Sequence, residues 1–379
     1  MRSGLSRTDV AHHLPHIVER MYRNIPSGVG ARRRDLRLSP SDMRAVLERG
    51  AAWAVSRGYG SEAELERVEE GGCLEGADPD LLSTRALERG RPQLGTLGSG
   101  NHFAELQYVA EIYDEPVATA FGLRLDQVTC MIHSGSRGLG HQVCQDHLRV
   151  MLDASRTYGI ALPDRQLCCA PLDSPEGRRY LAAMSAAANF AFANRQVMTH
   201  WVRESVCEAL QIAPEAARVD TVYDVCHNIA KLETFEIDGR PERLCVHRKG
   251  ATRAYPPGHP GTPAPYRHVG QPVLVPGDMG RYSYVLVGTA RAMRETFGST
   301  CHGAGRRMSR RKAKQAGDAR VLLGELRDRG IHVRAAGLAT VAEERPEAYK
   351  DVADVVRVVH EAGVSTRVAQ LRPLAVIKG

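Results

Sequence analysis

Five short segments that combine histidine with glycine, serine or asparagine constrain the structure of this chain more than any other feature. They occupy residues 98–103, 133–140, 227–228, 247–253 and 301–306. Imidazole is the commonest metal ligand in proteins and can also act as a nucleophile. Glycine lets backbone N–H groups close around a bound phosphate. The recurrence of both residue types, together with arginine, predicts metal-assisted phosphoryl or nucleotidyl transfer.

Buried-strand patterns of irregular spacing alternate with helical patterns along the chain. The predicted strands cover residues 128–132, 222–225, 244–247, 273–275, 284–287 and 374–377. The predicted helices cover residues 8–24, 40–57, 175–212, 310–329 and 346–362, and a capping box at Ser61 and Glu64 begins another. No internal repeat, low-complexity tract or linker interrupts this pattern. The sequence therefore predicts one large mixed domain of the α+β class over residues 1–379.

Composition narrows the class of protein further. The 379 residues include no apolar run that would span a membrane, and the N-terminus lacks the apolar core of a signal peptide. The nine cysteines are odd in number and show no C-x-x-C spacing, so we expect reduced thiols and a cytoplasmic location. The net charge of +7 favours a polyanionic partner.

Three histidines in the glycine-rich loops, His102, His133 and His227, are the candidate metal ligands. Strands that each end in a histidine loop can bring distant residues together at one end of a sheet. Any one of these histidines alone is better explained as a polar core residue or a surface residue. The loop setting of all three favours a metal site, although imidazole suits Mn, Zn, Fe or Ni and does not select among them.

The fourth histidine of interest, His302, precedes three small residues whose backbone N–H groups could cradle phosphate oxygens, namely Gly303, Ala304 and Gly305. Arg306 adjoins this loop, at the start of a basic run that we expect within one helix. The later members of that run (Arg311, Lys312 and Lys314) are better explained as a solvated face. Cys301 could act as a nucleophile, but an inert buried thiol is the simpler interpretation.

Other basic residues are candidates for contact with a nucleic-acid backbone or its phosphates. They are Arg137, Arg248, Lys249, Arg253 and Arg306. The alternative for residues 247–253 is an ordinary strand end with solvated charges. Neither a Walker A motif, a Rossmann fingerprint nor the K-x-D-G box of lysine-dependent ligases occurs. His12, His13 and His16 have zinc-like spacing, but they lie on an exposed helix face without a partner cysteine.

Seven sequence motifs occur in an order that closely resembles the RtcB family of RNA-splicing ligases. They begin at Gly95 (GTLGSGNHF), His133 (HSGSRGLGH), Asp224 (DVCHNIAK), His247 (HRKGATRA), Pro276 (PGDMG), Cys301 (CHGAGR) and Leu371 (LRPLAVIKG). The resemblance implies a GTP-dependent ligase with two Mn²⁺ ions that joins RNA ends bearing a 3′-phosphate or 2′,3′-cyclic phosphate to a 5′-hydroxyl, in tRNA splicing or RNA repair. It further implies a monomer, and an archease-type activator as a possible partner.

The resemblance also implies roles for individual residues. His302 corresponds to the histidine that becomes guanylylated, and His102, His133 and His227 correspond to manganese ligands. The implied contacts to the guanine nucleotide are Asn101, Glu105, Asn228, Asp278, Ser283, Tyr349 and Lys378, together with the loop 303–305. Asp278 stands where many relatives carry Ser.

One departure from the family pattern concerns the metal ligands. Relatives carry an Asp-x-x-Cys-Gly segment immediately before the position of Met1, and its Asp and Cys are metal ligands. We therefore expect either a start upstream of Met1 or an N-terminally truncated ligase with weakened metal sites. Two alternatives stay open: a ligation-inactive RNA-binding relative, and a metal-dependent phosphodiesterase that opens cyclic phosphates.

Overall fold

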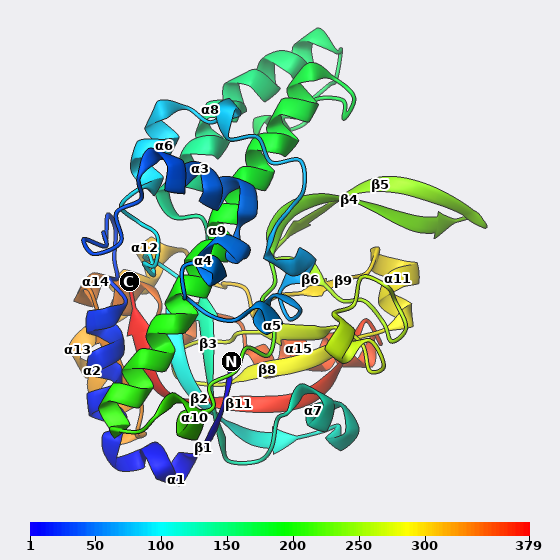
Figure 1. The fold of residues 1–379 in the computed structure, drawn as a ribbon. Coiled ribbons are helices and arrows are strands. Elements are labelled where there is room, and N and C mark those ends of the chain that lie inside the picture. The colour runs from blue at the N-terminus through cyan, green and yellow to red at the C-terminus, as the bar shows by residue number, and fades with distance from the viewer.

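A seven-stranded sheet forms the lower half of the molecule in Figure 1, and it contains both the first and the last strand of the chain. The structure is a computed structural model that describes residues 1–379. The strand order of the sheet is β1-β3-β2-β11-β8-β7. The remaining strand, β10, pairs only with β11. Every pairing in this sheet is antiparallel except that of β10 with β11. The strands are β1 (Arg2–Ser6), β2 (Phe103–Ile112), β3 (Gln127–His133), β4 (Asn228–Ile237), β5 (Arg240–Lys249), β6 (Ala251–Arg253), β7 (Pro272–Val275), β8 (Ser283–Gly288), β9 (Ser299–Cys301), β10 (His332–Ala335) and β11 (Ser365–Lys378).

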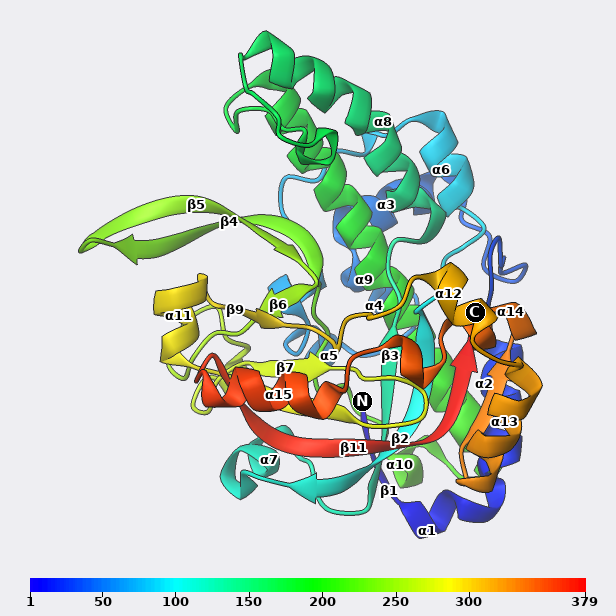
Figure 2. The ribbon, with the colours of Figure 1, turned by 180° about the vertical axis from the view of Figure 1, so that it is seen from behind.

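Helices cover both faces of the sheet and build a separate lobe above it (Figures 1 and 2). They are α1 (Arg7–Val10), α2 (Leu14–Asn24), α3 (Pro40–Arg49), α4 (Ala51–Ser56), α5 (Glu62–Leu65), α6 (Thr84–Gly90), α7 (Glu115–Phe121), α8 (Arg137–Thr157), α9 (Pro175–Leu210), α10 (Pro214–Ala217), α11 (Ala290–Thr296), α12 (Arg310–Gln315), α13 (Ala319–Asp328), α14 (Leu338–Glu343) and α15 (Val352–Glu361). The fold is therefore α+β, as the sequence predicts.

Alternate residues of the central strands pack against different helices. Ala104 and Leu106 of β2 lie in a core with α2 and α9. Phe103 and Val109 of the same strand lie in a second core with α7, α13 and α14. This alternation follows from the two-residue period of a strand. A third core joins α3, α4, α6 and α8 to the first half of α9, so this long helix connects the sheet to the upper lobe.

Most predicted elements are confirmed, and the differences have local causes. Gly50, with φ of 52°, divides the predicted helix 40–57 into α3 and α4. The predicted helices 310–329 and 346–362 each consist of two shorter helical segments, with Asp318 and Asp351 as N-caps of the second ones. Residues 222–225 are not a strand, because Asp224 pairs only with the Val68 segment through a single bridge.

Two further features complete the fold. A two-stranded hairpin of β4 and β5 projects beside the α8–α9 lobe (Figure 1), and β6 pairs separately with β9. No helix of the structure is both long enough and apolar enough to cross a membrane.

Candidate active site

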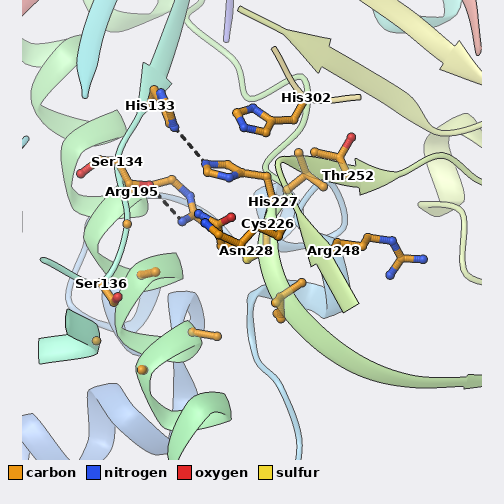
Figure 3. A pocket seen from close by; sticks show the side chains of 18 of the residues that line it. His133, Ser134, Ser136, Arg195, Cys226, His227, Asn228, Arg248, Thr252 and His302 are labelled. Atoms are coloured by element: carbon orange, nitrogen blue, oxygen red, sulfur yellow. Dashed lines mark hydrogen bonds between the residues drawn. The ribbon is translucent and has the colours of Figure 1, made fainter. Parts of the chain in front are cut away.

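Four of the histidine loops meet in space, although they are far apart in the sequence. His133 is the last residue of β3, and the adjacent strand β2 begins directly after His102. The register pairs Phe103 with His133, so the two histidines lie at the same end of the sheet. His227 directly precedes β4, and His302 directly follows β9. Figure 3 shows His133, His227 and His302 side by side.

The distances between these rings are short. Nε2 of His133 lies 2.9 Å from Nε2 of His227. The rings of His227 and His302 are stacked, with centroids 4.0 Å apart, and the His102 and His133 centroids are 5.5 Å apart. The structure therefore brings together all four histidines that the sequence singled out as ligands or as the site of guanylylation.

Burial keeps these imidazoles neutral near pH 7. It lowers the pKa of His102 to about 4 and that of His227 to about 3, with further lowering by nearby cationic groups. Burial also lowers the pKa of His133 well below its ordinary value, and it lowers the pKa of His302. A neutral imidazole has a lone pair, which both metal coordination and nucleophilic attack require.

The donor set fits a divalent metal in its chemistry. Nδ1 of His102 lies 2.9 Å from the Leu97 carbonyl oxygen, the kind of contact that orients a ligating imidazole and leaves its Nε2 free. Nδ1 of His227 is buried and has no hydrogen-bond partner. Even so, no three His, Cys, Asp or Glu side chains are arranged in the structure to hold an ion. The residues present therefore supply suitable nitrogen donors without forming a complete metal site by themselves.

A cavity of about 230 Å³ lies on one side of His302. Of the residues that the family resemblance assigns to the nucleotide, all except Asn228 line it; they are Asn101, Glu105, Asp278, Ser283, Gly303, Ala304, Gly305, Tyr349 and Lys378. Asn228 lies instead in a larger neighbouring cavity. Residues from five separate segments of the sequence therefore share one cavity.

Buried charges line this small cavity. Burial raises the pKa of Glu105 to about 8, and Asp278 adds to the rise, whereas Gln107 and Lys378 oppose it. Burial lowers the pKa of Lys378, against the opposing effect of the nearby carboxyls. Asp278 accepts a hydrogen bond from Arg281 at 2.6 Å, and this ion pair occupies one of its oxygens. The cavity therefore combines a carboxyl whose pKa burial raises with an amine whose pKa burial lowers, a pairing suited to a polar planar ligand.

Glu344 is a member of this cavity that the sequence analysis missed. Its fully buried side chain accepts hydrogen bonds from Arg306 at 3.1 Å and from the Tyr349 hydroxyl, and it lies 3.8 Å from Nζ of Lys378. The sequence signal for it is weak, because an acidic pair at the end of a short helix is usually exposed. Arg306 precedes α12 rather than lying within it, and Glu344 and Tyr349 fix its guanidinium beside the cavity.

A second cavity, of about 1270 Å³, lies on the other side of the histidines. Residues of α8, of α9 and of the base of the β4–β5 hairpin line it, together with all four histidines. Arg137 and Lys249 also line it, and Lys249 is exposed. Burial lowers the pKa of Arg137 to about 10, and its Nε donates to Oγ1 of Thr96 at 2.9 Å.

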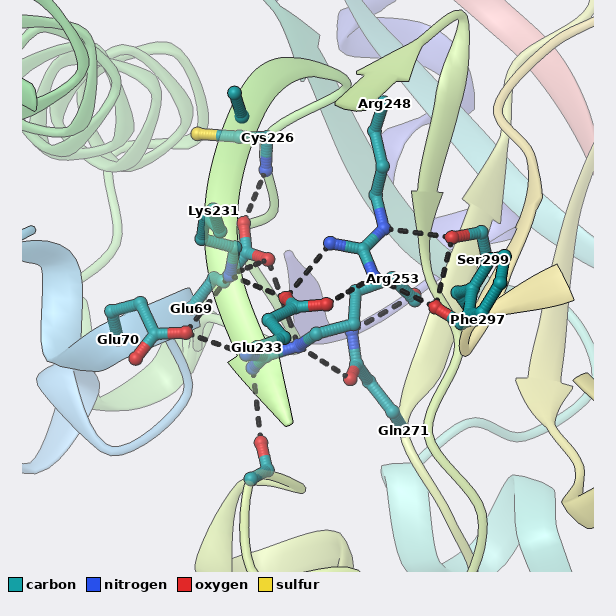
Figure 4. A network of polar contacts seen from close by, with 12 residues as sticks. Glu69, Glu70, Cys226, Lys231, Glu233, Arg248, Arg253, Gln271, Phe297 and Ser299 are labelled. Carbon is teal, nitrogen blue, oxygen red and sulfur yellow. Dashed lines mark hydrogen bonds and ion pairs between the residues drawn. The ribbon is translucent and has the colours of Figure 1, made fainter. Parts of the chain in front are cut away.

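The expectation that Arg248 and Arg253 bind an RNA backbone is wrong. Arg248 is fully buried and makes a two-pronged ion pair with Glu233, at 2.8 and 2.7 Å. Arg253 is also buried and pairs with Glu70, within the network of Figure 4. Both guanidinium groups are satisfied by carboxylates inside the protein, so neither is available to a phosphate. The sequence analysis misjudged them because strand ends usually carry solvated charges.

Comparison with known proteins identifies the family of this chain. A family model described as tRNA-splicing ligase RtcB matches residues 1–379. The chain belongs to the RtcB family. Curated RtcB relatives from Thermococcus kodakarensis and Archaeoglobus fulgidus, both named tRNA-splicing ligase RtcB, are 55% and 54% identical over the whole chain and 78% of their own length. The relative of the same name from Pyrococcus abyssi is 55% identical, and this chain spans 41% of its length.

Gly98 makes the close approach of two site residues possible in this RtcB chain, and its replacement is a direct test. Its φ of 103° disfavours other residues, and an added Cβ would lie 2.2 Å from both Nδ1 of His102 and Nη1 of Arg137. We expect Gly98→Ala to destabilise the fold by at least about 1–2 kcal/mol, the cost of a left-handed conformation alone. Urea unfolding measures this change. In Gly135→Ala, the matched control, the new methyl group meets no atom within 4 Å, and a loss of similar size there would contradict the argument.

Proposed function

We propose that this chain is an RNA ligase that joins 3′-phosphate or 2′,3′-cyclic phosphate ends to 5′-hydroxyl ends through a histidine–GMP intermediate, in tRNA splicing or RNA repair. The observation that carries the proposal is the position of His302, which lines both the small cavity and the large one. A group bound to this imidazole from the small cavity faces a substrate in the large cavity without leaving the protein. The family membership supplies the reaction class.

GTP is the proposed occupant of the small cavity. A lone pair of His302 attacks the α-phosphorus, so that an N–P bond forms and the P–O bond to pyrophosphate breaks. The imidazole then loses its remaining ring proton to solvent. The loop 303–305 and Arg306, which line this cavity, are the residues that we assign to the phosphates of GTP.

RNA is the proposed occupant of the large cavity. An oxygen of its 3′-phosphate attacks the phosphorus on His302, the N–P bond breaks, and the leaving imidazole takes up a proton from solvent to become neutral again. The 5′-hydroxyl of the second RNA end then attacks the 3′-phosphorus and displaces GMP. A cyclic phosphate end must first be opened by water. Lys249 and Arg137, which line this cavity, are the residues that we assign to RNA phosphates.

Manganese is the proposed metal, and His102, His133 and His227 would hold it. When bound, it would offset negative charge on the phosphoryl group and help to orient it. The neutral state of the three imidazoles supports this assignment. We further propose a monomer that acts in the cytoplasm, aided by an archease-type activator. All nine cysteines are free thiols, which suits a reducing compartment.

One assay separates this proposal from its two alternatives. An RNA with a 5′-hydroxyl and a 2′,3′-cyclic phosphate is incubated with the full chain, GTP and Mn²⁺, and the products are resolved on a denaturing gel. Circular or longer RNA supports the ligase. Opened ends without joining indicate a phosphodiesterase, and unaltered RNA indicates a ligation-inactive relative. Either of these two results contradicts the proposal.

A further inference from the structure

Two consecutive side chains near the middle of α9, Asn194 and Arg195, contact the loops of all three candidate metal ligands. Asn194 is completely buried and Arg195 is 9% exposed. Both belong to a 36-residue helix that connects the sheet with the upper lobe. Neither residue lines the small cavity, and the sequence assigned them no role.

Asn194 connects the loop of His102 to the loop of His133. Its Oδ1 accepts hydrogen bonds from the backbone N–H groups of Gly95 at 2.7 Å and Thr96 at 3.2 Å. Its Nδ2 donates to the carbonyl oxygens of Thr96 at 3.2 Å and Gly135 at 3.1 Å. One amide group thus holds the backbone on both sides of the gap between the two loops.

A short hydrogen-bond relay extends this contact to the imidazole of His102. The hydroxyl of Ser134, next to His133, donates to the Leu97 carbonyl oxygen at 2.7 Å. The same oxygen lies 2.9 Å from Nδ1 of His102. Nδ2 of Asn194 lies 3.3 Å from the Ser134 hydroxyl. The orientation of the His102 ring therefore depends on groups that Asn194 fixes.

Arg195 connects the loop of His133 to that of His227. Its Nη1 donates to the Ser134 carbonyl oxygen at 3.3 Å, and its Nε donates to Asp224 at 2.7 Å. Its Nη2 also lies 3.8 Å from Sγ of Cys226, the residue before His227. Figure 3 shows Arg195 between Ser134 and Cys226, below the histidine rings.

We propose that Asn194 and Arg195 are positioning residues that set the separation and orientation of His102, His133 and His227. A helix of this length is a rigid support, and hydrogen bonds from one turn of it tie three otherwise independent loops to a common frame. The inference deepens the proposed function, because the purpose of the frame is to present three imidazoles to one metal site.

The chain itself offers a matched control, Asn189. It lies on the same helix, is equally buried and makes three hydrogen bonds to backbone groups, one fewer than Asn194, to Leu47 at 2.9 Å and to Leu74 at 2.7 and 3.2 Å. Those partners belong to segments that carry no candidate ligand. Asn189→Ala and Asn194→Ala should therefore destabilise the fold to a similar degree while differing at the histidines.

The experiment compares the full chain with Asn194→Ala, Asn194→Asp and Asn189→Ala, using two measurements. The first is ¹⁵N NMR of histidine side chains without metal, which reports the tautomer and environment of each ring. The second is binding of Mn²⁺ alone, followed by the EPR signal of the free ion. We expect Asn194→Ala to shift the signals of His102 and His133 and to weaken Mn²⁺ binding by about 10–100-fold. Asn189→Ala should change neither measurement.

The remaining variant, Asn194→Asp, tests the hydrogen-bond donor of the amide separately from its acceptor. Asn194→Asp keeps the acceptor for the N–H groups of Gly95 and Thr96 but loses the donor to the Thr96 and Gly135 carbonyl oxygens and to the Ser134 hydroxyl, so we expect it to shift the signals of both His102 and His133. Unchanged histidine signals in Asn194→Ala, or equal losses in Asn194→Ala and Asn189→Ala, would overturn the inference. If the unaltered chain binds no Mn²⁺, the metal assignment of the proposed function fails, and the metal-free histidine spectra still decide the positioning role.

Discussion

His302→Ala is expected to abolish the transfer of radiolabel from [α-³²P]GTP to the protein. The substitution removes an imidazole that lines both cavities and directly precedes the loop 303–305. Because burial lowers the pKa of His302, its lone pair is available at neutral pH, so the unaltered chain should form an acid-labile adduct with Mn²⁺ present. The measurement is protein-bound label after gel separation, and we expect it to fall to background.

Cys301→Ser is the matched control, because Cys301 is the competing nucleophile next in sequence. Burial raises the pKa of this thiol to about 11, which leaves almost no thiolate at neutral pH. We therefore expect Cys301→Ser to retain the label. Label that survives in His302→Ala, or disappears in Cys301→Ser alone, would show that the histidine assignment is wrong. Circular dichroism of both variants checks that the fold is intact.

The parts of the fold that were predictable are those with strong local signals. Ser174 and Pro175 are an N-cap and a first helical residue, and they mark the start of α9. The apolar runs of β3, β7 and β8 have the length of buried strands. The predicted element that the structure lacks depended on contacts between distant segments. A predicted strand at 222–225 lacks a partner strand, because the chain there is held by Arg195 and the Val68 segment instead. Pairing between distant strands has no local sequence signal.

The sequence predicts the residues of the candidate site where histidine occurs together with glycine. It does not predict the buried polar residues that hold the histidine loops in place. His102, His133, His227 and His302 stand out because each lies in a loop of small residues. Asn194 and Arg195 lie in an alanine-rich helical stretch, where only the packed structure reveals which loops they reach. The same limitation explains the error at Arg248, since the carboxylate that neutralises it, Glu233, is 15 residues away in the sequence and lies on the neighbouring strand β4, diagonally across the ladder.

The second large effect that we expect is a loss of stability when Glu69, in a buried network of charges, is replaced. Three carboxylates (Glu69, Glu70 and Glu233) face three cations (Lys231, Arg248 and Arg253) at the base of the β4–β5 hairpin (Figure 4). Glu69 is 1% exposed, pairs with Lys231 at 2.8 Å and also accepts the Cys226 N–H at 2.8 Å. Glu69→Gln leaves one buried cation without its counter-charge, so we expect a loss of about 3–5 kcal/mol at pH 7. Urea unfolding followed by tryptophan fluorescence measures it.

The loss should depend on pH in a defined direction. Burial alone would raise the pKa of Glu69, but Lys231, Arg253 and the Cys226 N–H outweigh it and lower the pKa from 4.5 to about 2. A carboxyl with a lowered folded-state pKa contributes its full stability above 4.5 and loses it as the pH falls toward 2. The gap in unfolding free energy between the unaltered chain and Glu69→Gln should therefore be constant from pH 7 to about 5 and shrink at lower pH. Glu70→Gln, whose side chain is 40% exposed, should cost less, and a gap for Glu69→Gln that is independent of pH would contradict the ionised state of this carboxylate.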